Sequence, residues 1–143
     1  MDKIPDDVKQ QIWSNFDEYR VVYLATSENN QPRVRPVTLV YLDSRFYILT
    51  GTGDAKVKQI AGNPMVELCL PLDGGENTGY VRMSGRAVII NEMKIKEKVA
   101  ANVDYFNTYW KDAGDTDYTL LEIDIRGIEY LEPGEMLAQK YIP

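Results

Sequence analysis

Two arginines stand close together near the start of the chain's central part, in the segment PRVRPV. Arg33 and Arg35 are two residues apart, so on a β-strand their side chains point to the same face. Such a face could meet an anionic, planar ligand. The alternative is that both arginines are solvated on an exposed strand surface.

A second cationic group follows one strand later. The run FYILT leads into Thr50, Gly51 and Thr52, a turn that opens a short helix carrying Lys56 and Lys58. Free N–H groups at the start of a helix, together with the helix dipole, favour a phosphate. The two lysines point to different sides of a helix, so we expect only one, Lys56, to reach a shared ligand. The alternative for residues 50–52 is a tight turn without a ligand.

The sequence contains no histidine. Its absence excludes Ser-His-Asp and Cys-His nucleophilic sites, a histidine-ligated haem and nearly every zinc or non-haem iron site. If the protein is an enzyme, a bound organic cofactor must therefore carry the difficult chemistry.

The formal net charge is −6 at pH 7, which argues against nucleic acid as a partner. Cys69 is the single cysteine, so no disulfide forms within the chain and a reducing compartment is expected. The N-terminal residues lack the apolar core of a signal peptide, and no run approaches the roughly 18 apolar residues of a membrane span. We therefore expect a cytoplasmic protein without a membrane partner.

Hydrophobic periodicity predicts strands over residues 21–26, 32–42, 46–50, 65–70 and 79–91, and a last strand over 118–125 and 128–131, broken at Arg126-Gly127. Helices are predicted for the opening segment after Pro5 and for residues 54–61 and 92–111. Residues 71–78 are expected to form a mobile polar loop, and the tail from Glu132 carries little pattern. Gly85 is expected at a bulge or corner.

We expect residues 1–143 to form a single domain, because 143 residues suffice for one real core. About six antiparallel strands joined by hairpins, with a helical insert near the end, indicate a mainly β (α+β) fold. The prediction is a small closed or partly closed barrel with two to three helices outside it. An OB-like barrel is the nearest alternative.

The order of these motifs resembles the FMN-binding split-barrel family, whose best-known member is pyridoxamine 5'-phosphate oxidase. The resemblance rests on PRVRPV, FYILTGTGDAKVKQI, Asn63-Pro64 before the next strand, and YVRMSGRA at residues 80–87. It covers residues 21–92 and, more weakly, the chain to residue 131. It implies a six-stranded antiparallel Greek-key split β-barrel that binds FMN, in a homodimer with the flavin between subunits.

The resemblance also implies roles for individual positions. Residues 35–38 match a strand that lies along the flavin, Thr50 matches a residue near the ring system, and Lys56 matches one that grips the phosphate. Asp54 and Ala55 stand where the family has Ser and Arg. Asp54 would repel a phosphate, so we expect it to cap the helix or turn away, with Thr52 and Lys58 as substitutes.

Three further positions complete the candidate site. Tyr80 stands where the family has Gln, Ser84 lies four residues on, and Trp110 with Tyr109 is a candidate for a wall from the second subunit. For Trp110, packing of a helix is the alternative role. The candidate cofactor-binding residues are Arg33, Arg35, Pro36, Val37, Thr38, Thr50, Gly51, Thr52, Lys56, Lys58, Tyr80, Ser84 and Trp110.

Two classes of function remain open. One is an FMN-dependent oxidoreductase, in which the flavin carries hydride and Arg33 or Arg35 stabilises the anionic reduced ring. A true pyridoxamine 5'-phosphate oxidase is not expected, because that enzyme uses an Arg and a His near the carboxyl terminus and this chain ends EMLAQKYIP. A flavin-reductase, nitroreductase-like or stress-related member fits better. The other class is a non-catalytic protein that stores or senses FMN or haem, and a deazaflavin in place of FMN is also open.

Overall fold

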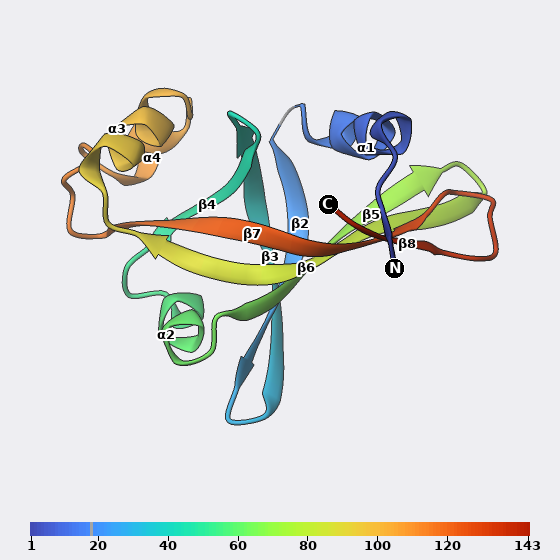
Figure 1. Ribbon diagram of the computed structural model, residues 1–143. Helices are drawn as coiled ribbons and strands as arrows, with labels where there is room; N and C mark the ends of the chain where they lie inside the picture. Colours follow the sequence, from blue (N-terminus) through green and yellow to red (C-terminus); the bar gives the residue numbers. More distant parts are fainter. Residues whose placement is uncertain (18) are drawn as a thin grey trace.

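A ring of β-strands forms the body of the computed structural model, which describes residues 1–17 and 19–143 (Figure 1). Neighbouring strands in the ring are antiparallel, and the pairing of β6 with β7 closes it. The ring strands are β2 (Arg20–Glu28), β3 (Gln31–Leu42), β4 (Arg45–Gly51), β5 (Met65–Gly74), β6 (Asn77–Ile90) and β7 (Tyr118–Leu131).

Two short strands extend the sheet beyond β7. β8 (Gln139–Ile142) is antiparallel to β7, and β1 (Asp2–Lys3) is parallel to β8. The predicted mainly β barrel with outer helices is therefore confirmed, whereas the strand count among the described residues is eight rather than six. Both extra strands are too short to show alternation, and their pairing joins the two ends of the chain.

Left-handed residues close two of the hairpins. Asn29 and Asn30 have φ of 49° and 64° between β2 and β3, and Asp43 and Ser44 have φ of 50° and 63° between β3 and β4. Two-residue turns with positive φ match the twist of the strands, and Asn and Asp tolerate this conformation. Local turn chemistry thus fixes the β2–β3–β4 meander.

The prediction of a mobile loop over residues 71–78 is wrong. β5 and β6 continue through this segment as a hairpin that pairs Gly74 with Asn77, and Gly75 has a φ of 81° at the turn. The strand ends are exposed there, so no buried face imposes alternation on the sequence.

β7 is continuous, so the irregularity predicted at Arg126-Gly127 is a β-bulge rather than a break: Gly127 pairs with Ser84 and Ile125 with Gly85, and Arg126 is the extra residue between them. The irregularity lies in its pairing with β6, whose register shifts between Ser84 and Gly85. A Cβ atom on Gly85 would overlap the backbone oxygen of Asp124, so the strands can approach this closely only at a glycine. The expected irregularity at Gly85 is therefore a β-bulge.

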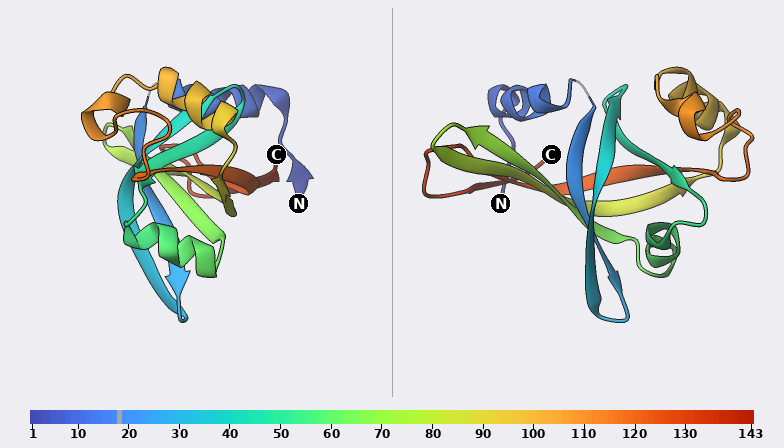
Figure 2. Two further views of the ribbon diagram at one scale, coloured as in Figure 1. Left: turned by 90° about the vertical axis from the view of Figure 1, so that its left-hand side faces the viewer. Right: turned by 180° about the vertical axis from the view of Figure 1, so that it is seen from behind.

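Four α-helices lie outside the ring in the described chain: α1 (Asp6–Trp13), α2 (Ala55–Gly62), α3 (Met93–Ala101) and α4 (Phe106–Tyr109). α1, followed by a 3₁₀ turn (Ser14–Phe16), and the α3–α4 arm lie toward opposite ends of the barrel (Figure 2). The helix predicted over residues 92–111 is interrupted, because α3 ends at Asn102. The side-chain amide of Asn102 donates to the Lys98 carbonyl at 2.8 Å. None of these helices is long and apolar enough to cross a membrane.

Two apolar cores share the strands. The larger fills the ring and is covered by Ile12 and Phe16 from the N-terminal helical segment. The smaller lies beneath the α3–α4 arm, where Val99 and Phe106 pack on Tyr118 and Leu120 of β7. The arm is therefore fixed by its own core, which holds its aromatic residues against the barrel.

Candidate functional site

β3 and β4 separate soon after their shared turn. They pair only from Val40 to Leu42 of β3, and beyond that point β3 pairs with β2 while β4 pairs with β7. A cavity of about 410 Å³ lies where the two strands diverge, and we call it the β3–β4 cavity. It is lined by Pro36, Val37, Thr38, Ile48, Leu49, Thr50, Gly51, Asp54, Lys56, Tyr105, Tyr109 and Trp110.

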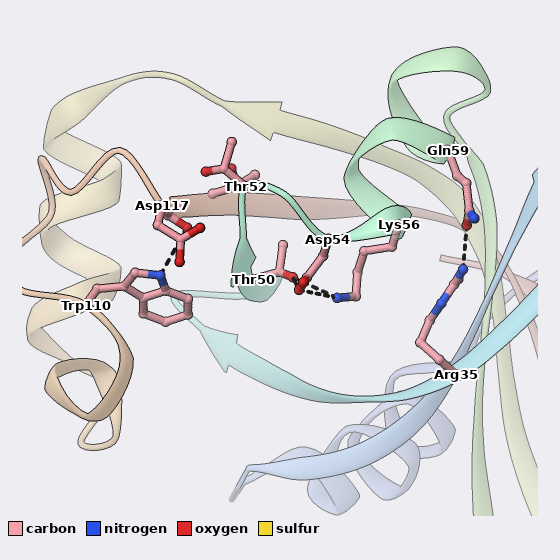
Figure 3. Close-up of polar contacts among 9 residues, drawn as sticks. Arg35, Thr50, Thr52, Asp54, Lys56, Gln59, Trp110 and Asp117 are labelled. Atoms are coloured by element: carbon pink, nitrogen blue, oxygen red, sulfur yellow. Dashed lines mark hydrogen bonds and ion pairs between the residues drawn. The ribbon is translucent and has the colours of Figure 1, made fainter.

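Three polar side chains meet at one side of this cavity, and we call them the Lys56 corner (Figure 3). Thr50 donates to Asp54 Oδ2 at 2.6 Å, and Lys56 Nζ lies 2.7 Å from Thr50 Oγ1 and 3.1 Å from Asp54 Oδ2. The Lys56 side chain is 13% exposed and that of Asp54 is 54% exposed. The corner joins the end of β4 to the first turn of α2.

Asp54 behaves differently from the expectation that it caps α2 or turns away. It occupies the N-cap position with extended backbone, but its side chain makes no capping hydrogen bond. It faces the cavity instead, where the hydrogen bond from Thr50 and then that from Lys56 hold its pKa below the usual range. Asp54 is therefore an ionised wall residue paired with the lysine.

An aromatic wall formed by Tyr105, Tyr109 and Trp110 bounds another side of the cavity. Trp110 is nearly buried, and its Nε1 donates to the Asp117 carbonyl at 3.1 Å. Burial raises the pKa of Tyr105 to about 12, with smaller contributions from Tyr19 and Tyr109. The smaller core holds the wall in place, since Trp110 belongs to that core and Tyr105 packs against it.

The structure brings together seven of the residues proposed from the sequence. Within one chain they approach the same cavity from β3, from β4 and its following turn, from α2, and from the arm. They are Pro36, Val37, Thr38, Thr50, Gly51, Lys56 and Trp110.

The two arginines lie elsewhere, although they share a strand face as predicted. Arg35 points toward α2 and donates to Gln59 Oε1 at 2.5 Å, to Thr26 Oγ1 at 2.8 Å and to the Leu24 carbonyl at 3.2 Å. Thr26 in turn donates to Gln59 Oε1 at 2.6 Å. We call Arg35, Thr26 and Gln59 the Arg35 network, of which Figure 3 shows the contact between Arg35 and Gln59. Arg33 is exposed and lies 3.8 Å from Glu28.

The remaining four candidates also lie outside the cavity lining. The Thr52 hydroxyl donates to the Thr116 carbonyl at 2.8 Å, and exposed Lys58 borders a separate polar hollow with Gln59 and Asn63. On β6, the Tyr80 hydroxyl donates to Glu129 at 2.6 Å. Ser84 is exposed beside Gly127 of β7, at the bulge.

Sequence reasoning missed several residues of the cavity. Tyr105 lines it, and Trp110 and Tyr109, which were expected to form a wall from the second subunit, line it from within the same chain. The carboxylate of Asp117 also approaches this region, because its oxygens lie 3.5 and 3.6 Å from where a Cβ on Gly51 would be. Only the four-residue spacing of the two tyrosines was visible in the sequence, and a continuous helix explained it equally well.

The shape of the cavity suits a flat ring system. Strand backbone and small side chains form one side, and aromatic rings stand on another. Because β3 and β4 diverge here, strand-edge N–H and C=O groups are left for a ligand rather than for the sheet. The Lys56 corner supplies one cation at the edge, but that cation is already paired with Asp54.

Comparison with known proteins identifies the family and the fold. The sequence model of the family described as pyridoxamine 5'-phosphate oxidase matches residues 8–132. The chain belongs to the pyridoxamine 5'-phosphate oxidase family. General stress protein 26 of Bacillus subtilis (strain 168) is 28% identical to it over 130 residues, which cover 90% of this chain and 91% of the relative.

Solved structures share the fold of this family member. A NimC/NimA family protein from Clostridium acetobutylicum superposes with a TM-score of 0.75 at 21% identity, covering 92% of this chain and 90% of the other. An FAD-binding protein from Mesorhizobium loti gives a TM-score of 0.70 at 20% identity, covering 90% of this chain and 94% of the other. The split-barrel topology is therefore shared well beyond recognisable sequence similarity.

Proposed function

We propose that the protein binds FMN in the β3–β4 cavity and acts as an oxidoreductase on a small molecule. The observation that carries the proposal is the convergence of Pro36, Thr38 and Thr50 with the aromatic wall around one cavity. Pro36, Thr38 and Thr50 are positions that the family resemblance assigned to the flavin, and they meet at one cavity without any assumption about a ligand. The fold is shared with the FAD-binding protein from Mesorhizobium loti, which supports a flavin as the ligand.

When bound, the flavin would supply the redox chemistry by accepting and donating hydride. The protein's residues would position and shield it. Trp110 and Tyr105 offer apolar ring faces that exclude water, and the strand edges at Pro36–Thr38 and Thr50 offer backbone groups that orient polar ring atoms. Lys56 would lie beside the ribityl and phosphate end. Arg35 is held by Gln59 and Thr26, so its role would be to fix α2 rather than to touch the ring.

The archetypal oxidase activity is not proposed. The sequence has no histidine to take the role that the resemblance gives to a histidine in substrate binding. A reductase acting on another small substrate fits this site better.

The test is reconstitution of the purified protein with FMN. We expect a yellow complex after removal of free flavin, a rise in the unfolding temperature that grows with FMN concentration, and bleaching on addition of NAD(P)H. Absence of both visible absorbance and thermal stabilisation would contradict the proposal.

The second candidate is a non-catalytic protein that holds flavin or haem. The observation that favours haem is the exposed Tyr109 side chain at the cavity, because a tyrosine can ligate haem iron in a chain without histidine. A Soret band after haem addition, lost in Tyr109→Phe, would support this candidate. Repeated turnover of bound flavin with an added electron acceptor would support the oxidoreductase.

We also propose a homodimer that covers the outer face of β2, β3 and β5. Val21 and Val34 on this face are 59% and 69% exposed, and Tyr23 and Met65 are exposed beside them. Val21 pairs with Thr38 and Tyr23 pairs with Pro36, so the apolar face continues directly into the cavity. A partner on this face would close the open side of the site.

The dimer is tested by light scattering and FMN titration of Val34→Lys. We expect a monomer with weakened FMN binding, because a charge would enter the apolar face. Met136→Lys, at a residue that is 95% exposed in the tail, is the matched control and should remain dimeric. A wild-type monomer would contradict this part of the proposal.

A further inference from the structure

The charge of the Lys56 corner is balanced before any ligand arrives. Among the described residues that line the cavity, Lys56 is the only cation, and the Asp54 carboxylate accepts from it at 3.1 Å. A lysine ammonium has three N–H donors. Two of them are directed to Asp54 and Thr50, so one remains for a ligand.

The surroundings add negative rather than positive charge. Gly51 and Asp54 share the turn at the end of β4. The carboxylates of Asp54 and Asp117 both lie near Gly51, since Asp54 Oδ1 is 3.6 Å, and the Asp117 oxygens are 3.5 and 3.6 Å, from where a Cβ on Gly51 would be. Arg35 is committed to Gln59 and Thr26. A dianionic phosphate at this corner would therefore meet the Asp54 carboxylate and one lysine that is already paired, with the Asp117 carboxylate beyond them, beside Gly51.

From this geometry we propose that Asp54 is a specificity-determining residue that competes with the phosphate of a bound flavin for Lys56. The inference rests on the proposed flavin site and deepens it. The phosphate adds little to affinity, so the cavity accepts flavins with and without a phosphate and exchanges them readily with solution. The flavin is then closer to a diffusible substrate than to a permanently held group.

The physical reason is that a phosphate and the Asp54 carboxylate both accept hydrogen bonds from the same donors, Lys56 and Thr50. To bind Lys56 fully, a phosphate must displace the carboxylate from both Lys56 and Thr50, and those hydrogen bonds are lost. If the carboxylate stays, like charges lie side by side, which is unfavourable. The Asp54 side chain is half exposed, so it can also rotate into water when a phosphate binds. The carboxylate therefore weakens phosphate binding without preventing it.

Asp54→Asn separates charge from shape. The amide oxygen can still accept from Thr50, while the negative charge beside Lys56 is removed. Asp54→Ser is a second variant that removes the charge with a smaller side chain. Asp7→Asn, at an exposed residue in α1 away from the cavity, makes the same change of net charge and is the matched control.

The experiment compares FMN with riboflavin, which lacks the phosphate, by titrating flavin fluorescence against each variant. For the wild type we expect dissociation constants within about tenfold of each other. For Asp54→Asn and Asp54→Ser we expect FMN to bind at least about tenfold more tightly, with riboflavin unchanged. Asp7→Asn should leave both constants unchanged, and adding Lys56→Met to Asp54→Asn should abolish the gain.

Each outcome decides something. A wild-type preference for FMN of about a hundredfold or more, or an FMN-to-riboflavin ratio that neither Asp54 variant changes, overturns the inference while the flavin site stands. Failure of every variant to bind either flavin overturns the proposed function and this inference together. Thermal unfolding of each variant verifies that it is folded when titrated.

Discussion

Two cations near the same helix are used in opposite ways. Lys56 and Gln59 are three residues apart on α2, so they lie on neighbouring parts of its surface. Gln59 and Arg35 tie the helix to β2 and β3 in a largely buried network, whereas Lys56 stands at the cavity with a half-exposed carboxylate. A cation with neutral, buried partners fixes the structure, and a cation with a charged, movable partner is available to a ligand.

The largest expected effect is on folding, from breaking the Arg35 network. Arg35→Met removes the three hydrogen bonds of the guanidinium and leaves the Leu24 carbonyl with one partner fewer. We expect a loss of about 2–3 kcal/mol in the free energy of unfolding, measured with urea. Arg33→Met, at an exposed arginine, should change it by less than about 0.5 kcal/mol. Equal effects of the two substitutions would contradict the distinction.

At the cavity we expect a large effect on ligand binding and a small effect on stability. Lys56→Glu places a like charge beside the phosphate and beside Asp54, so FMN affinity should fall by roughly thirtyfold, or about 2 kcal/mol. Stability should fall by only about 1 kcal/mol, because the Asp54 side chain is half exposed. Parallel FMN titration and urea unfolding measure the two effects. FMN affinity that stays at the wild-type value would remove Lys56 from the site.

The aromatic wall belongs to both regions, because it lines the cavity and also packs in the smaller core. The raised pKa of Tyr105 means that the folded state holds this proton more tightly than the unfolded state. Its contribution to stability is complete below the ordinary value of 10.0 and is lost as pH rises through about 12. Urea unfolding between these pH values should show falling stability, with a shallower fall in Tyr105→Phe. Burial also raises the pKa of Tyr118, so a residual slope is expected in the variant.

The smallest effect is expected at Gly51. The nearest atoms to a Cβ there are carboxylate oxygens of Asp117 and Asp54, at ordinary contact distances, so Gly51→Ala should change stability by less than about 0.5 kcal/mol. Gly85→Ala, at the bulge, provides the contrast, since its Cβ would overlap backbone. A measurable loss of FMN affinity in Gly51→Ala with unchanged stability would indicate that the ligand passes over this turn.

Local chemistry made much of this fold predictable. The meander through β4 and the start of α2 follow from turn residues and alternation that lie within a few positions of one another. The interruption between α3 and α4 does not, because apolar residues keep helical spacing across Asn102, with Val99 before it and Val103 and Phe106 after it. β1 and β8 were missed for another reason, since both are too short to show alternation and the partner of β1 lies at the other end of the chain.

The site shows the same division. Alternation predicted correctly that Arg33 and Arg35 share a face, but it could not say what that face meets. The answer depends on Gln59, which α2 brings to β3 only in three dimensions. Asp54 was identified as an anomaly from its position alone, whereas its pairing with Lys56 needed the geometry of the turn.

The divergence of β3 and β4 has a consequence for how such a site can change. Each strand keeps a full ladder on its other edge, with β2 and with β7, so the opening between them does not depend on what fills it. One side of the opening belongs to the arm, which has a separate core of its own. Substitutions in the arm can therefore change which ligand binds without breaking the strand pairing of the barrel, so the same fold can bind different ligands.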